Sequence, residues 1–454
     1  MANKNLLTYN AKVTQVEQDY FAPVASVFGT TTPISTLYCF LSRVVPWPNE
    51  TNPTQPTQDQ KAIKSVYKNM FVAKLINSSN ISPVIQRIDW ISGDVYDYYQ
   101  DDVDMFELNS AGNLVRRFYV RNKYDQVFKC LWNNNDADAT DEPFFQPGSY
   151  GTNNIYKGSD GYKWKYMYTI DVGSKTKFMD SAWIPVPVGS VILNPIGSTA
   201  GYGDIEAINV VNGGNGYDPA NAAITVVITG DGSGATGTAS VTAGEITDII
   251  VTNTGSDYTF ANVAVTSTLG SNATFIAPIS PIGGHAYDPI DELGASHTMV
   301  TVEFNSDESG NLPTDIDYRQ VGLLVNPTAL STYPAPANGS IYRTTTDIVV
   351  APGFGVFAED ETVYQGASLA TATFTATVLN FDPASNLIRL INTVGDYTVN
   401  APIFGSSSLT ARTVLTVSTP DFVLFSGYLT YIENRESVQR SADGIEQFKF
   451  VLGY

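Results

Sequence analysis

Cysteine and histidine are scarce in this sequence of 454 residues, with two of each. Cys39 and Cys130 lie in apolar, strand-like stretches, so we interpret both as small core residues of a chain kept in a reducing compartment. His285 and His297 have no third nitrogen ligand and no cysteine pair at zinc spacing beside them. A zinc site is therefore not expected.

Long apolar runs and an excess of positive charge are also missing. No run of about 18 apolar residues occurs, so no segment is expected to span a membrane. The first residues, MANKNLLTYNAK, lack the apolar stretch of a secretory signal. The chain has 45 Asp and Glu against 25 Lys and Arg, a net charge of -20. This balance makes nucleic acid and anionic membranes poor partners.

Two motifs that carry catalysis are absent from the sequence: there is no GxxxxGK[ST] and no GxSxG. Gly213–Asp218 fits one copy of a calcium-roll turn, but such rolls need tandem copies, so we interpret it as a glycine turn. Asp136, Asp138 and Asp141 resemble the start of an EF-hand loop without its glycine or its flanking helices. We predict no catalytic, cofactor-binding or metal-binding residues, and no enzyme.

Thr, Ser, Asn, Gly, Val and Tyr are abundant, and these residues suit strands and turns better than helices. The composition therefore predicts a mainly β fold. The clearest helical pattern covers Lys61–Ile76, with Asp59 as its N-cap and with lysines on the face opposite the apolar one. These lysines suit either a solvated helix face or a patch that binds an anion or a partner, and the solvated face is the simpler interpretation.

A change of composition predicts the domain organisation. Between Gly201 and Pro278 there is no Trp, Lys or Arg, and a segment beginning at Ile205 is repeated from Ile246. We predict a β-sandwich-like main domain with a few helices and two small inserted all-β domains. The main domain would consist of 1–197, 281–339 and 420–454, and the inserts of 198–280, with its two-copy repeat, and 340–419. The last segment is predicted to form a closing hairpin of Gly427–Glu433 and Ile445–Leu452.

Aromatic residues are concentrated in the first part of the chain, where all five tryptophans precede residue 184. Trp90–Phe106 interleaves tyrosines with five acidic residues. Such a segment suits a protein-binding rim, or a tyrosine-rich loop packed on its own domain. We expect the tryptophan-rich first segment to supply interfaces.

Several runs of residues, in chain order, resemble the dimeric baseplate wedge protein of T-even-like contractile phage tails. The most specific parts are Asp160-Gly161-Tyr162-x-Trp164-x-Tyr166, within SDGYKWKYMYTI at 159–170, and Tyr431-x-Glu433-Asn434-Arg435, within SGYLTYIENR at 426–435. The remaining runs are YNAKVTQ near Tyr9, RVVPW at 43–47, QRIDW at 86–90, VFKCLWN at 127–133 and RQVGLLVNP at 319–327. Residues 198–280 and 340–419 have no counterpart in the T-even protein, and they look like the inserted β-modules of marine phage structural proteins.

The resemblance implies a virion component of the tail baseplate, made in the host cytoplasm, with no enzymatic activity or cofactor. Its partners would be other wedge proteins and a second copy of itself. The sequence leaves a second function open, that of a carbohydrate-binding tail adhesin acting through the inserts, although no motif indicates a host glycan. A tail-associated glycosidase is a third alternative, but nothing selects one carboxylate pair from the 45 acidic residues.

Overall fold

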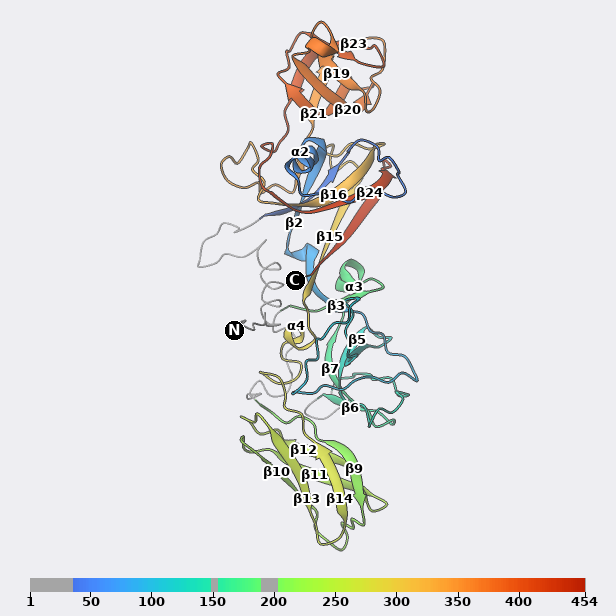
Figure 1. Cartoon of the computed structure of the whole chain (residues 1–454), viewed down its shortest axis with the longest axis vertical. Helices are drawn as coiled ribbons and strands as arrows, with labels where there is room; N and C mark the ends of the chain where they lie inside the picture. The colour runs from blue at the N-terminus through green and yellow to red at the C-terminus, as the bar shows by residue number, and fades with distance from the viewer. Residues whose placement is uncertain (1–35, 148–153, 189–202, 454) are drawn as a thin grey trace, which may run out of the picture. The chain divides into compact units, whose positions relative to one another are not determined.

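A computed structural model of the chain describes residues 36–147, 154–188 and 203–453. The predicted mainly β fold is confirmed, because strands account for most of the regular structure along the coloured chain of Figure 1. The described residues divide into two compact units: one holds Ser82–Met299 and 451–453, and the other holds 36–81 and Val300–Phe450. The YNAKVTQ run near Tyr9 lies outside the described residues.

The first unit is built around a four-stranded antiparallel sheet in the order β4-β5-β7-β6. Its strands are β4 (Tyr119–Arg121), β5 (Gln126–Trp132), β6 (Ile155–Lys157) and β7 (Lys163–Thr169). The central strand β5 is buried along its whole length, as a continuous apolar run predicts. Elsewhere in this unit, β3 (Ile81–Gln86) pairs with β8 (Trp183–Pro185), and the helices are α3 (Val172–Phe178) and α4 (Pro289–Glu292).

The six strands between residues 209 and 276 pair in a pattern that follows the sequence repeat. They are β9 (Asn209–Asn215), β10 (Thr225–Gly230), β11 (Thr236–Thr242), β12 (Glu245–Asn253), β13 (Ala261–Thr266) and β14 (Ser271–Ile276). The middle strands of the two copies, β10 and β13, pair with each other, while the outer strands pair crosswise as β9 with β14 and β11 with β12. Exchanging the two copies therefore leaves the pairing pattern unchanged.

The glycine turns of the two copies occupy equivalent places. Gly214 has φ +64° and Gly255 has φ +66°, a conformation that side chains disfavour. A Cβ at Gly214 would lie 2.2 Å from the carbonyl oxygen of Ser271, and one at Gly255 would lie 2.5 Å from the amide nitrogen of Ala235. The positive φ that the glycine-turn interpretation of Gly213–Asp218 required is present at Gly214 and Gly216, but residues 213–215 form the end of strand β9 and not a turn.

The second unit contains a five-stranded sheet that joins distant parts of the chain, in the order β17-β2-β1-β16-β24. Its strands are β1 (Leu37–Ser42), β2 (Met70–Ile76), β16 (Asp317–Val325), β17 (Ile341–Arg343) and β24 (Tyr428–Gln439). The central strand β16 is buried from Asp317 to Leu324. Its neighbours come from the first 45 residues and from the last 30, so this sheet is the core that the separated segments share.

The predicted helix over Lys61–Ile76 is wrong in its second half. Helix α2 (Gln60–Asn69) ends at Asn69, and Met70 begins the strand β2. Met70 continues the apolar face of the helix, so the helical pattern extends past the true end of α2. The segment MFVAKLI is instead an apolar strand that pairs with β1 on one side and β17 on the other. The N-cap is confirmed, because Asp59 Oδ1 accepts a hydrogen bond of 2.9 Å from the amide of Ala62.

Residues 346–418 form a closed six-stranded barrel, which carries the labels β19, β20, β21 and β23 in Figure 1. The strands are β18 (Thr346–Val350), β19 (Thr362–Gln365), β20 (Phe374–Asp382), β21 (Leu387–Gly395), β22 (Pro402–Gly405) and β23 (Ala411–Ser418). Alternating residues of these strands, among them Ile348, Val363 and Leu390, fill the barrel interior. Two short 3₁₀ turns, Ser78–Asn80 and Leu369–Thr371, also belong to this unit.

The predicted closing hairpin is wrong, although both of its strands exist. Strand β24 pairs with β16, whereas β25 (Ile445–Gly453) lies next to β15 (His297–Asn305) in another sheet. Fully buried Arg440, between the two strands, donates to the carbonyls of Pro313 and Ser306 and so holds the chain where it changes sheets. Alternation of side chains shows that a strand exists, but it does not show which strand lies beside it.

Candidate functional site

The aspartates that resemble calcium ligands are not brought together. Asp218 accepts hydrogen bonds from Ala220 N–H and from the side chain of Asn221, which closes its own turn. Asp136 accepts from the side chain of Asn133, and Asp141 accepts from the amide of Ser159. Within residues 36–147, 154–188 and 203–453, no group of three or more His, Cys, Asp or Glu is placed to hold a metal ion.

Both cysteines are fully buried and free, which confirms their interpretation as core residues. Burial raises the pKa of the Cys130 thiol well above its usual range, so this thiol is unsuited to act as a nucleophile. The two histidines occupy separate places. His297 packs against the ring of Trp183 at 4.5 Å, and His285 belongs to a buried group of charges described below.

The aromatic rings of Trp90–Phe106 pack inward. Tyr96 is fully buried with its ring edge against Trp164 at 5.6 Å, and Tyr98 packs against Trp132 at 5.0 Å. The structure therefore favours the packed-loop interpretation of this segment over the rim. Trp132 and Trp164 are buried and the other three tryptophans are partly buried, so none offers an exposed ring to a partner.

A group of five buried ionisable side chains lies on one side of the β4-β5-β7-β6 sheet. Lys129 of β5 is fully buried, with its Nζ 3.1 Å from Glu292 Oε2 and 3.1 Å from His285 Nδ1. The same Nζ lies over the ring of Tyr99, 3.9 Å from its centroid, which is a cation–π contact. Because an ammonium can only donate, Nδ1 of His285 must accept and the imidazole is neutral.

The second half of this group is the ion pair of Lys165 and Glu206, 2.6 Å apart and nearly inaccessible to solvent. Glu206 Oε1 also accepts a hydrogen bond of 2.7 Å from the backbone amide of His285. We call Lys129, Lys165, Glu206, His285 and Glu292 the buried charge cluster. With a neutral imidazole it holds two positive and two negative charges, so it buries no net charge.

Each pKa shift in the buried charge cluster has an identifiable cause. Burial raises the pKa of Glu206, but the charge and hydrogen-bond interactions with Lys165 and His285 together outweigh burial, and the pKa is lowered. Burial lowers the pKa of Lys129. Burial, reinforced by the charge of Lys129, lowers the pKa of His285 well below its ordinary value. The favoured state is therefore an ionised Glu206 beside a neutral His285.

His285 gives the protein a predictable response to acid. Below the ordinary histidine pKa of about 6.5 the unfolded chain takes up a proton that the folded chain refuses, so stability falls as the pH drops. We expect His285 to account for roughly 1 kcal/mol of lost unfolding free energy per pH unit between pH 6 and 5. The variant His285→Gln, which keeps an acceptor, should lose that slope in denaturant titrations. Equal slopes in both proteins would contradict this assignment.

The buried charge cluster lies where the chain enters and leaves the β9–β14 domain. The amide of Ser280 donates to the carbonyl of Asp204 at 2.9 Å, so the two crossings run side by side. Two further contacts tie the start of the domain to the sheet: Lys163 Nζ donates to Ile208 O at 2.6 Å, and the Asn209 side chain donates to Leu131 O at 2.8 Å. The domain is held at its base through several buried polar contacts.

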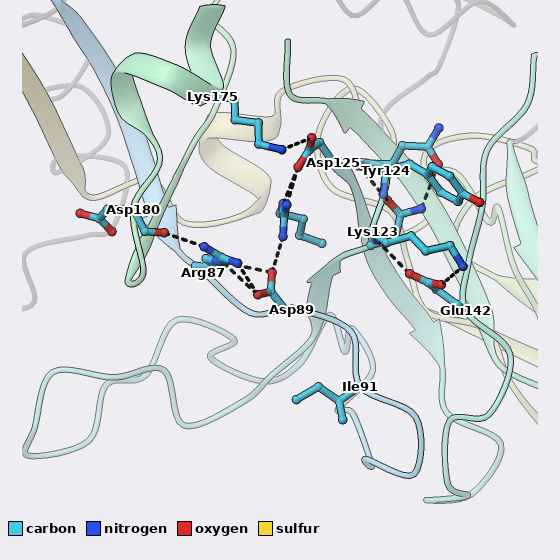
Figure 2. A network of polar contacts seen from close by, with 12 residues as sticks. Arg87, Asp89, Ile91, Lys123, Tyr124, Asp125, Glu142, Lys175 and Asp180 are labelled. Carbon is cyan, nitrogen blue, oxygen red and sulfur yellow. Dashed lines mark hydrogen bonds and ion pairs between the residues drawn. The ribbon is translucent and has the colours of Figure 1, made fainter. Parts of the chain in front are cut away.

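A second polar network, shown in Figure 2, ties loops together in the same unit. Arg87 forms an ion pair of 2.7 Å with Asp89 and donates to the carbonyl of Asp180 at 2.8 Å. Arg121 bridges from Asp89, at 2.7 Å, to Asp125. Lys175 of α3 completes the chain of contacts at 2.7 Å from Asp125. This network is partly exposed, and its charges are paired within it.

The barrel of the second unit is also held at its base by buried charge. Arg43, at the end of β1, is 5% exposed and lies 3.0 Å from Asp317 and 2.9 Å from Asp360 of the barrel. It also donates to the carbonyl of Leu379 at 3.2 Å. Where the chain enters and leaves the barrel, Arg343 and Asp421 hydrogen-bond through their backbones at 2.9 Å.

One end of the barrel presents an exposed apolar tip, which we define as Phe354, Val356 and Leu409. Phe354 is fully exposed, Leu409 is 84% exposed and Val356 is 60% exposed. Their two loops lie together, because Thr410 Oγ1 donates to Val356 O at 3.1 Å. Apolar side chains that group in this way mark a surface suited to contact with another protein.

Sequence reasoning missed the buried charge cluster, although one signal was present. Lys129 interrupts the apolar run VFKCLW, and a lysine in a strand that is buried on both faces needs an internal partner. The identity of that partner was not readable, because Glu292 and His285 follow more than 150 residues later. Arg43 gave no comparable signal, since it stands at the end of a strand.

Comparison with known proteins leaves the family open. No protein-family model matches this sequence, and no curated protein matches it. In the part of the chain that the structure describes, no helix is long and apolar enough to cross a membrane.

Proposed function

We propose that the chain is a structural subunit of the baseplate wedge of a contractile phage tail, joining neighbouring wedge proteins and a second copy of itself. The observation that carries this proposal is where the runs resembling the wedge family fall in the fold. Residues 319–327 and 426–435 supply β16 and most of β24, which pair with each other, and β1 on the other side of β16 leads into the run at 43–47. Residues 127–133 and 159–170 supply β5 and β7, which pair likewise.

The two regions without a wedge counterpart fold outside those sheets. One contains the β9–β14 domain, which the buried Lys165–Glu206 pair ties to its sheet. The other contains the barrel, which buried Arg43 ties to its sheet through the partly exposed Asp360. A subunit that must hold its neighbours at set positions gains from such anchoring, because a flexible tether would leave the added domains free to turn. The exposed apolar tip of the barrel supplies a surface for a neighbouring subunit.

Particles made by a phage that encodes this chain test the proposal. Immunogold labelling with antibodies against the purified chain should decorate the tail end of intact particles and, in extracts without particles, free baseplates. Label on the capsid alone, or none on purified particles, would contradict a baseplate role.

The adhesin alternative depends on exposed aromatic residues in the inserts, and the structure offers Phe260, Phe354 and Tyr397. Tyr217 and Tyr258, by contrast, are buried in the core of the β9–β14 domain, and Tyr202 lies outside the described residues. A glycan array probed with the full chain distinguishes the two functions. Selective binding that is lost in Phe260→Ser or Phe354→Ser would favour the adhesin, and no binding favours the baseplate subunit.

A further inference from the structure

A groove in the second unit combines unpaired positive charge with a cavity of ligand size. It lies between α2, the end of β1 and the barrel, and its volume of about 690 Å³ is within the usual range for ligand sites. Lys61, Lys64 and Lys68 line it from the helix. Within the described part of the chain, none of the three lysines forms an ion pair, although most other described lysines do.

The charge in this groove is not neutralised by its own walls. The spacing of the lysines at i, i+3 and i+7 keeps them on one side of α2, where like charges repel and weaken the helix slightly. Asp360 is the carboxylate among the lining residues, and Arg43 already holds it at 2.9 Å. A chain of net charge -20 thus keeps three free positive charges together in one hollow.

The rest of the lining indicates the kind of anion. Val44, Pro46 and Ile391 provide apolar wall, while Gln60 and Asn392 provide side-chain amides. Such a mixture suits the backbone and side chains of a peptide. Lysine ammonium groups bind carboxylates as point charges and demand no fixed geometry. A long phosphate chain would extend beyond the groove over a surface that is acidic overall, which opposes its binding.

We propose that this groove binds an acidic peptide segment of a partner protein, with the three lysines holding its carboxylates. The inference is independent of the proposed baseplate role, since it depends on the groove alone. Because the attraction between the lysines and the carboxylates of the peptide is electrostatic, the affinity should fall as the salt concentration is raised from 50 to 200 mM.

The test uses the full chain and a fluorescently labelled hexaglutamate peptide, with hexaglutamine as the neutral comparison and tripolyphosphate as a competing anion. Fluorescence anisotropy should show hexaglutamate binding at least tenfold more tightly than hexaglutamine. In the variant Lys61→Gln/Lys64→Gln/Lys68→Gln that affinity should fall at least tenfold. Gln is about as good a helix former as Lys, so α2 should be retained, and thermal unfolding checks this.

The matched control is Lys123→Gln/Lys157→Gln/Lys175→Gln, which removes the same charge from lysines that are paired elsewhere. It should bind hexaglutamate within about twofold of the unchanged chain. Equal weakening in both triple variants would overturn the proposal, because the peptide would then be attracted by lysines anywhere on the chain and not by the groove in particular. Tighter binding of tripolyphosphate than of hexaglutamate would also overturn it, in favour of a phosphate site.

Discussion

Replacing Lys165 with Met is expected to lower the free energy of unfolding by about 3–5 kcal/mol, the usual cost of leaving one member of a buried ion pair alone. Without the ammonium at 2.6 Å, Glu206 must either stay ionised in a buried site or take up a proton there, and both outcomes cost free energy. Urea titration measures the change. Hydrogen exchange should localise it to 204–209 and 279–285, the base of the β9–β14 domain.

Two variants control this result. Lys157 is 44% exposed and pairs with Asp248 on the same domain, so Lys157→Met should cost about 1 kcal/mol or less. The double variant Lys165→Met/Glu206→Gln should be more stable than Lys165→Met, because no unpaired charge remains and the glutamine oxygen still accepts from the His285 amide. If Lys165→Met unfolds like the unchanged chain, the buried charge cluster does not hold the domain.

Replacing Arg43 with Met should weaken the attachment of the barrel, with an expected loss of about 2–4 kcal/mol. The expected loss of unfolding free energy is smaller than for Lys165→Met. Asp317 would still have its ion pair with Arg319 at 2.6 Å, and Asp360 is 44% exposed, so that water can solvate its charge. The carbonyl of Leu379 would lose its donor. Denaturant unfolding gives the size of the effect, and faster amide exchange at 358–362 and 379 would locate it.

The comparison for Arg43 is Arg435→Met in the same unit. Arg435 pairs with Glu433 at 2.9 Å, with both side chains more than a third exposed, and it packs over Phe448. Its loss should cost about 1 kcal/mol. Equal losses from Arg43 and Arg435 would mean that burial adds nothing at the barrel base.

The sequence predicted those parts of the fold whose pattern is local. Alternation located the two final strands, β24 and β25, and the repeat from Ile205 and Ile246 appears in the structure as crosswise strand pairing. Strand partners were not predictable, because the same alternation fits a hairpin or two separate sheets. The final strands β24 and β25 show this, since buried Arg440 and not the spacing of apolar residues decides where the chain turns.

The candidate sites depended even more on distant partners. The tyrosines of Trp90–Phe106 suited an interface as well as a core, and only the positions of Trp132 and Trp164 show that they pack inward. The lysines of α2 were identified from helical spacing alone. The groove around these lysines was not predictable from the sequence, because its opposite wall comes from the barrel, about 300 residues later in the chain.

The central claim is that separated segments of this chain build a framework for holding other subunits, with two added domains fixed to it. An electron cryo-microscopy map of the tail end of the phage particle tests this most directly. We expect repeated copies of the chain in the baseplate, with neighbouring subunits touching the barrel tip at Phe354 and Leu409. A map in which the chain is absent from the baseplate, or contacts no neighbouring subunit there, would contradict the account.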